Sequence, residues 1–92
     1  MKVQIRTIYN VPLTNAGQEY SQTFLTEAAG YLVQCRSLND IQIAFISGDS
    51  GTTYLTIAAG SAYNENVGII GKNIIYMQSQ TAGVVVEILV YN

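Results

Sequence analysis

The chain has 92 residues and a mass of 10.0 kDa, which limits it to one small domain over residues 1–92. Hydrophobic residues make up 49% of the sequence and charged residues 11%, against about 25% charged residues in an average soluble domain. This composition excludes intrinsic disorder, which requires low hydrophobicity and high charge. The net charge of −2 also argues against a lone monomer that is kept soluble by its own charge.

The basic residues are scattered along the chain and form no cluster. We therefore expect no binding to nucleic acid and none to an anionic membrane surface. Residues 1–6 alternate between polar and apolar, unlike the continuous apolar region of a signal peptide, and no apolar run approaches the roughly 20 residues of a membrane span. The single cysteine, Cys35, makes the fold independent of an intrachain disulfide, so we expect folding in a reducing cytoplasm.

The first half of the chain alternates between polar and apolar residues with a period of two, as half-buried strands do. Turn-forming residues punctuate a connection over residues 10–17, and residues 37–40 are predicted to turn the chain. Ile41, Ile43 and Phe45 are expected to form the apolar face of the strand that follows this turn. The predicted strands of this half cover residues 2–9, 20–26, 31–36 and 41–45.

The second half begins with a strong turn signal at residues 47–51. Thr53, Leu55 and Ile57 are expected to share one face of the strand after it. The predicted strands of this half cover residues 53–57, 73–79 and 84–91, the last two being expected to pair as a hairpin. Roughly six to eight short strands of this kind predict an all-β, antiparallel sandwich or small barrel.

Two parts of the chain weakly resemble each other. Residues 31–46 and residues 74–89 both have a strand, a turn and a second strand, and residues 26–30 are similar to residues 56–60. Two interleaved hairpin halves of this kind would suit a jelly-roll-like sandwich. Short hairpins also look alike by chance, so both explanations stay open.

The sequence lacks the residues on which most enzyme chemistry depends. It has no histidine to activate a nucleophile, and Cys35 lies in a predicted strand where core packing is its simpler role. The loop at residues 48–51 has one carboxylate and no following helix, which favours a plain hairpin turn over a calcium or phosphate site. The carboxylates are scattered singly, and only folding could pair two of them as in a glycosidase: Glu19, Glu27, Asp40, Asp49, Glu65 and Glu87. We expect no catalytic residue, no metal site and no cofactor.

Glu87 interrupts the most apolar predicted strand, where it is in phase with Val85 and Leu89. Two interpretations are possible. If that face is buried, the carboxylate must pair with Arg36, with Lys72 or with a neighbouring subunit. If it is the outer face of an edge strand, the charge hinders edge-to-edge aggregation.

The segment 67–71 is apolar and flanked by glycine, although it lies in a predicted connection. Connections are normally exposed, so Ile69 and Ile70 either fold back over the end of the sandwich or meet another chain. The low charge of the whole sequence favours the second explanation. We therefore take Ile69, Ile70 and Glu87 as candidate subunit-contact residues.

The C-terminal half contains TYLTIAAG at residues 53–60 and IIYMQSQTAGVVVEIL at residues 74–89. With these two segments it resembles small β-proteins of tailed bacteriophages. Members of that group often end on a tryptophan, where this chain has Tyr91 and Asn92. The resemblance implies a capsid-associated accessory protein, namely a decoration, cement or head-fibre-base subunit with a jelly-roll-like and often trimeric structure.

The predicted function is therefore that of a structural virion protein without enzymatic activity. We expect a homo-oligomer, most simply a trimer, that assembles in the host cytoplasm and binds the major capsid protein on the outside of a phage shell. The alternative is a tail or fibre module that binds host carbohydrate through tyrosine, asparagine and glutamine side chains. The seven tyrosines are spread about one per strand, which favours a structural use for most of them.

Overall fold

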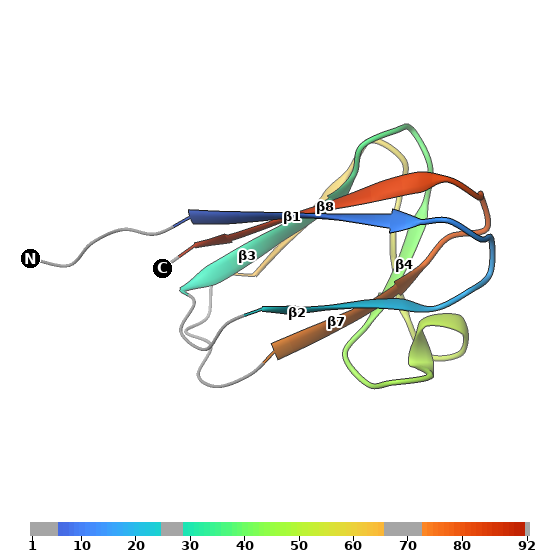
Figure 1. The fold of residues 1–92 in the computed structure, drawn as a ribbon, viewed down its shortest axis with the longest axis horizontal. Coiled ribbons are helices and arrows are strands. Elements are labelled where there is room, and N and C mark those ends of the chain that lie inside the picture. Colours follow the sequence, from blue (N-terminus) through green and yellow to red (C-terminus); the bar gives the residue numbers. More distant parts are fainter. Residues whose placement is uncertain (1–5, 25–28, 66–72, 92) are drawn as a thin grey trace, which may run out of the picture.

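The computed structural model describes residues 6–24, 29–65 and 73–91, which form eight strands and one short 3-10 helix, η1 (Asp49–Gly51). The strands make two antiparallel, four-stranded sheets that face each other as the layers of a sandwich (Figure 1). Sheet A has the order β1 (Arg6–Leu13), β8 (Val84–Tyr91), β3 (Gly30–Cys35), β6 (Ala62–Glu65). Sheet B has the order β2 (Tyr20–Phe24), β7 (Asn73–Gln78), β4 (Ile41–Ala44), β5 (Leu55–Ile57). The predicted all-β sandwich is confirmed.

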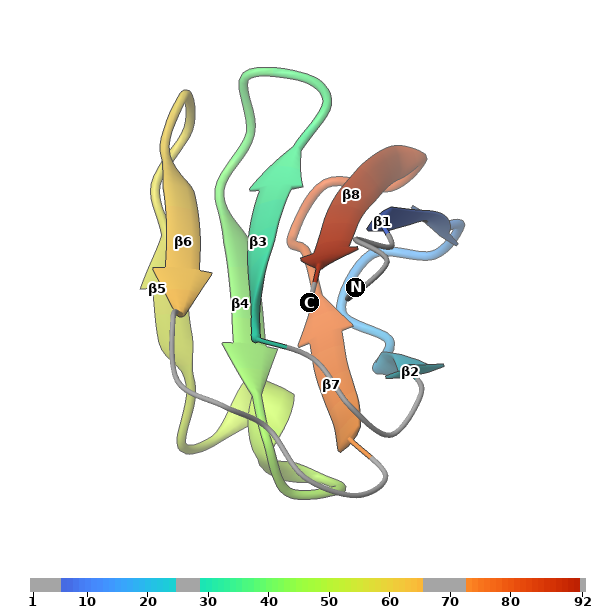
Figure 2. The ribbon, with the colours of Figure 1, turned by 90° about the vertical axis from the view of Figure 1, so that its left-hand side faces the viewer.

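The strand pairs are nested within one another. The first strand pairs with the last, β2 with β7, β3 with β6, and β4 with β5, and all four pairs are antiparallel. The pairs β3–β8 and β4–β7 then join these ribbons into the two sheets. As a result β1 and β2 lie at one side of the sandwich, and β5 and β6 lie at the other (Figure 2).

The hairpins expected from β3 to β4 and from β7 to β8 are therefore wrong. In both cases the two strands lie in different sheets, and the chain crosses from one sheet to the other between them. Alternation of apolar residues shows which side chains face the core, but it does not distinguish a neighbour in the sheet from a strand across the core. Of the consecutive described strands, only β4 and β5 pair with each other.

The first strand extends further along the chain than expected, because residues 10–13 continue it instead of forming a connection. Val11 and Leu13 point into the core and are buried. Pro12 is tolerated because β1 pairs only with β8 and is an edge strand of sheet A. The expected punctuation at Asn10 and Pro12 is thus wrong, and the turn comes after Leu13.

The core lies between the two sheets and takes every second side chain of the central strands. In β8 the alternation is complete: Val84, Val86, Ile88 and Val90 are buried, and the residues between them are half-exposed. Burial of one such side chain stabilises the fold by about 1.5–3 kcal/mol. The remaining members of the core cluster are Val11, Leu13, Phe24, Tyr31, Val33, Ile41, Ile43, Ile57, Ile75 and Met77.

Two residues that were assigned to apolar strand faces lie outside the core. Phe45 follows the end of β4 and is 52% exposed, and Leu55 is 44% exposed at the start of β5. The chain leaves sheet B after Ala44 and returns only at Leu55, so of the three residues in β5 only Ile57 is buried. Strand β6 was not predicted, because its sequence AYNE contains no apolar alternation.

The long loop between β4 and β5 is held in place by one carboxylate from another connection. Glu19 accepts hydrogen bonds from the amides of Gly48 and Ser50 at 2.9 and 3.1 Å, and one from the Ser50 hydroxyl at 2.5 Å. The loop begins its 3-10 turn after Gly48, whose φ of 89° favours glycine. Glu19 thereby fixes a loop that lies over one part of sheet B.

Candidate functional site

The outer face of sheet A carries an apolar row that crosses three strands. Ile8 of β1 lies opposite Leu89 of β8, and Leu32 of β3 lies opposite Leu89 on the other side. Directly opposed residues of neighbouring strands have Cβ atoms about 5 Å apart, so the three side chains form one continuous surface. Ile8 is 68% exposed, and the row borders a hollow of about 220 Å³. We call this set, Ile8, Leu32 and Leu89, the sheet A apolar row.

A polar row lies beside it, one step along each strand on the same face. Asn10, Glu87 and Gln34 are opposed across β1, β8 and β3. Gln34 Nε2 donates to Glu87 Oε1 at 3.0 Å, and Arg36 Nε donates to Glu87 Oε2 at 3.0 Å. The bond from Gln34, followed by the bond and the charge of Arg36, lowers the pKa of Glu87. The carboxylate therefore has partners for both oxygens within its own chain.

The position of Glu87 combines parts of the two interpretations of this residue. It lies on the outer face of the sandwich, as the second interpretation expects, but β8 is a central strand of sheet A, so an edge-strand role is wrong. Its ion-pair partner is Arg36, which the first interpretation named for a buried face. The other two candidate contact residues, Ile69 and Ile70, and the alternative cation Lys72 lie outside the described residues.

Comparison with known proteins gave no match to a family model, to a curated protein or to a solved structure. The function of the chain must therefore be argued from its surfaces and from the chemistry of their side chains.

A second apolar surface lies at the end of the β4–β5 hairpin. Phe45, Ile46, Tyr54 and Leu55 are all more than two-fifths exposed and line a hollow of about 320 Å³. We call this set the hairpin-tip patch. The sequence does not reveal this patch, because Phe45 and Leu55 fit an alternating pattern that predicts them on the apolar faces of strands.

Cys35, Glu65 and Tyr31, three groups that could support catalysis, have structural partners. Cys35 is half-buried beside the core, with Sγ 3.6 Å from the Ser37 hydroxyl. Glu65 accepts hydrogen bonds from the hydroxyls of Tyr31 and Tyr63. Burial, followed by this bond to Glu65, raises the pKa of Tyr31, so its hydroxyl stays protonated. Tyr31 packs against Phe24, with ring centroids 5.5 Å apart, as part of the core.

Residues 6–24, 29–65 and 73–91 contain no group of three or more Cys, Asp or Glu side chains that could hold a metal ion. Those residues also contain no helix that is long and apolar enough to cross a membrane.

Proposed function

We propose that this chain is a structural virion protein that forms a homotrimer and binds the outside of a phage capsid. The observation that carries the proposal is the sheet A apolar row, which a monomer would leave in contact with water. Contiguous apolar surface on a soluble protein marks a site of interaction with a partner.

The neighbouring polar row suits a buried interface. A carboxylate costs several kcal/mol to bury unless it is paired and hydrogen-bonded. Glu87 meets this condition through Gln34 and Arg36, with no contribution from a second chain. The outer face of sheet A can therefore be covered by a sister subunit without leaving a buried charge unpaired. In a cyclic trimer this surface of each subunit packs against a different surface of the next subunit, and the same contact repeats around the closed ring.

We infer further that the sandwich is a jelly roll. The support for this inference is the nested pairing, in which the first strand pairs with the last and each later strand pairs one step inward. Folding one long ribbon of four such pairs over itself gives the observed orders β1-β8-β3-β6 and β2-β7-β4-β5. Double-sheet jelly rolls of eight strands occur in viral capsid proteins and in lectins.

The virion location rests on the resemblance of residues 53–60 and 74–89 to capsid-associated phage proteins. In the structure these residues include all of β5, most of β7 and most of β8. They supply Leu89 and Glu87 to the outer face of sheet A. The segment on which the resemblance depends thus contributes to the surface proposed for assembly, and the major capsid protein is its proposed second partner.

Static light scattering of the purified chain at micromolar concentration tests the oligomeric part of this proposal. Three copies of a 10.0 kDa chain give an expected mass of 30 kDa that persists on dilution. A mass of 10 kDa at all concentrations would contradict self-assembly, and a stable mass of 20 kDa would contradict the trimer.

A further inference from the structure

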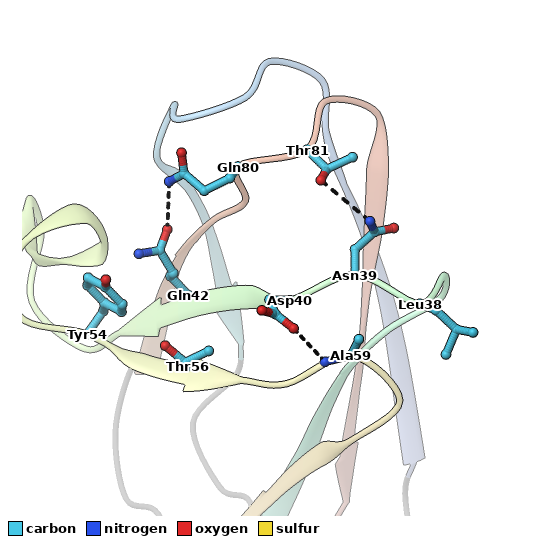
Figure 3. Close-up of a pocket in the computed structure, with 9 residues that line it drawn as sticks. All are labelled: Leu38, Asn39, Asp40, Gln42, Tyr54, Thr56, Ala59, Gln80 and Thr81. Atoms are coloured by element: carbon cyan, nitrogen blue, oxygen red, sulfur yellow. Dashed lines mark hydrogen bonds between the residues drawn. The ribbon is translucent and has the colours of Figure 1, made fainter.

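A polar hollow of about 480 Å³ lies on the outer face of sheet B, away from the surface proposed for assembly. Its floor is formed by Gln42 of β4 and Thr56 of β5, which lie directly opposite each other in the sheet. The turns after β3, β5 and β7 supply its walls, including Asp40 and Gln80 (Figure 3). Its volume falls within the range of about 300–1,000 Å³ that is usual for small-molecule sites.

The amide of Gln42 is held in one orientation by two neighbouring amides. Its Oε1 accepts from Gln78 Nε2 at 3.2 Å and from Gln80 Nε2 at 3.1 Å. Gln78 is itself buried and lies 3.2 Å from the hydroxyl of Ser50, which in turn donates to Glu19. These contacts connect Glu19, which holds the β4–β5 loop, to the hollow. Gln42 Nε2 has no partner among the described residues and is available to a ligand.

The carboxylate of Asp40 is fixed in a similar way. Its Oδ1 accepts a hydrogen bond from the amide of Ala59 at 2.7 Å, and its Oδ2 accepts none from the described residues. Among the described residues that line the hollow there is neither a lysine nor an arginine. Asp40 therefore offers a strong, oriented acceptor, and its negative charge disfavours phosphate and other anionic ligands.

Two exposed apolar side chains stand at opposite ends of the polar floor. Tyr54 is 44% exposed at one end, and Leu38 is 81% exposed at the other (Figure 3). A tyrosine ring offers a flat apolar face that packs well against C–H groups. Between these ends lie amide donors and acceptors together with the hydroxyls of Thr56 and Thr81, which can both donate and accept.

We propose that this hollow binds a neutral saccharide. A sugar ring presents hydroxyl groups around its edge and C–H groups on its faces. The hydroxyl groups match the acceptor of Asp40 and the donor of Gln42, and a C–H face matches the ring of Tyr54. A purely apolar ligand would leave the amides and the carboxylate of the hollow without hydrogen-bond partners. The site lies on the opposite side of the sandwich from the sheet A apolar row, so this inference stands independently of the proposed trimer.

The test uses the full-length chain, labelled with ¹⁵N, and a panel of neutral monosaccharides and disaccharides of hexoses and N-acetylhexosamines. We expect at least one of them to shift the backbone amide signals of Gln42, Thr56 and Gln80 with a Kd of about 1 mM, a weak affinity typical of an open site with few contacts. If no saccharide shifts these signals at about 10 mM or above, or if the shifts map to the outer face of sheet A, the proposal fails.

Variants of the hollow separate specific binding from general effects on the fold. Tyr54→Ala should weaken binding at least about tenfold, and Tyr54→Phe should keep it within about twofold, because the ring carries the contact. Asp40→Asn keeps an acceptor for the amide of Ala59 but removes the charged acceptor, and it should also weaken binding. Phe45→Ala is the matched control, an exposed aromatic residue outside the hollow, and it should leave the affinity unchanged. Equal loss in Tyr54→Ala and Phe45→Ala would overturn the assignment.

Discussion

At the scale of single residues, Glu19 has the clearest structural role among the described carboxylates. It ties the start of β2 to the β4–β5 loop, which is separated from it by about 30 residues of sequence. The hydrogen bond from the Ser50 hydroxyl is the main cause of the lowered pKa of Glu19, and the amides of Gly48 and Ser50 act in the same direction. The sequence shows Glu19 only as one isolated acid, because its partners come from a distant loop.

The pH dependence of stability should reveal the contribution of the hydrogen bonds between Glu19 and the β4–β5 loop, which we call the Glu19 clamp. A carboxyl group whose pKa is lower in the folded state stabilises the fold above its unfolded pKa, and this stabilisation is lost as the pH falls through the folded value. Glu19→Gln should lower the free energy of unfolding at pH 7 by roughly 1–2 kcal/mol, towards the lower end of what bonds to a charged group contribute, because the bonds lie near solvent. The loss should shrink as the pH falls below the usual pKa of a glutamate and through the lower folded value, where Glu19 becomes protonated. Urea unfolding at a series of pH values from 7 downwards measures both effects.

Asp49→Asn provides the matched control for this experiment. Asp49 belongs to the same loop, but its carboxylate makes no hydrogen bond to the described residues. The substitution should change the free energy of unfolding by less than about 0.5 kcal/mol at pH 7. If Asp49→Asn and Glu19→Gln had the same effect, the loss would reflect the net charge of the molecule and not the clamp.

At the scale of strands, apolar alternation predicts which side chains face the core and says little about pairing. The inward faces of β2, β3 and β8 and most of that of β4 follow from the sequence, because more buried and less buried residues largely alternate along each of these strands. The extension of β1 through Pro12 and the polar strand β6 could not be predicted in this way. Both are edge strands, in which a missing amide or a lack of apolar residues is tolerated.

One constraint on the packing of the strands comes from Gly30, which has no side chain and so plays no part in the alternation of apolar and polar residues. A Cβ atom on Gly30 would lie 2.3 Å from the carbonyl oxygen of Glu65, the partner of Tyr31 in the pairing of β3 with β6. Only glycine permits this approach of β6 to the start of β3. In the sequence Gly30 only precedes the strand predicted over residues 31–36, and its function in packing becomes visible only once β6 is known.

Neighbouring isoleucines in β7 test the register of sheet B. Ile75 is 1% exposed in the core, and Ile74 is half-exposed on the opposite face of the same strand. Ile75→Ala should lower the free energy of unfolding by about 2–5 kcal/mol, because it leaves a cavity. Ile74→Ala should lower the free energy of unfolding by less than half of that amount. Chemical denaturation measures both, and a larger loss for Ile74→Ala would mean that β7 is shifted by one residue.

At the scale of the whole molecule, the two outer faces of the sandwich have different chemistry. The outer face of sheet A presents the apolar row and a carboxylate whose partners lie within the chain. The outer face of sheet B carries the polar hollow and the clamped loop. The proposed trimer uses the first face and the proposed saccharide site uses the second, so one chain can do both at the same time.

Neither surface could be predicted in full from the sequence. Glu87 stands out in the sequence because it interrupts an apolar strand, but the sequence leaves open whether its face is buried. The structure places it on the outer face. The sheet A apolar row did not stand out, because Ile8, Leu32 and Leu89 are far apart in the chain and only the register of three strands aligns them. The hollow requires three separate turns to meet at the end of sheet B.

The central claim is that sister subunits cover the outer face of sheet A. The molar mass of two variants tests this claim most directly. Ile8 and Ile46 are about equally exposed, at 68% and 67%, but Ile8 lies on the sheet A apolar row and Ile46 lies on the hairpin-tip patch. By light scattering, Ile8→Lys should reduce the mass from 30 kDa to 10 kDa, since a buried, unpaired ammonium is costly, and Ile46→Lys should leave the trimer intact. A trimer that survives Ile8→Lys, or one that only Ile46→Lys dissociates, would contradict the claim.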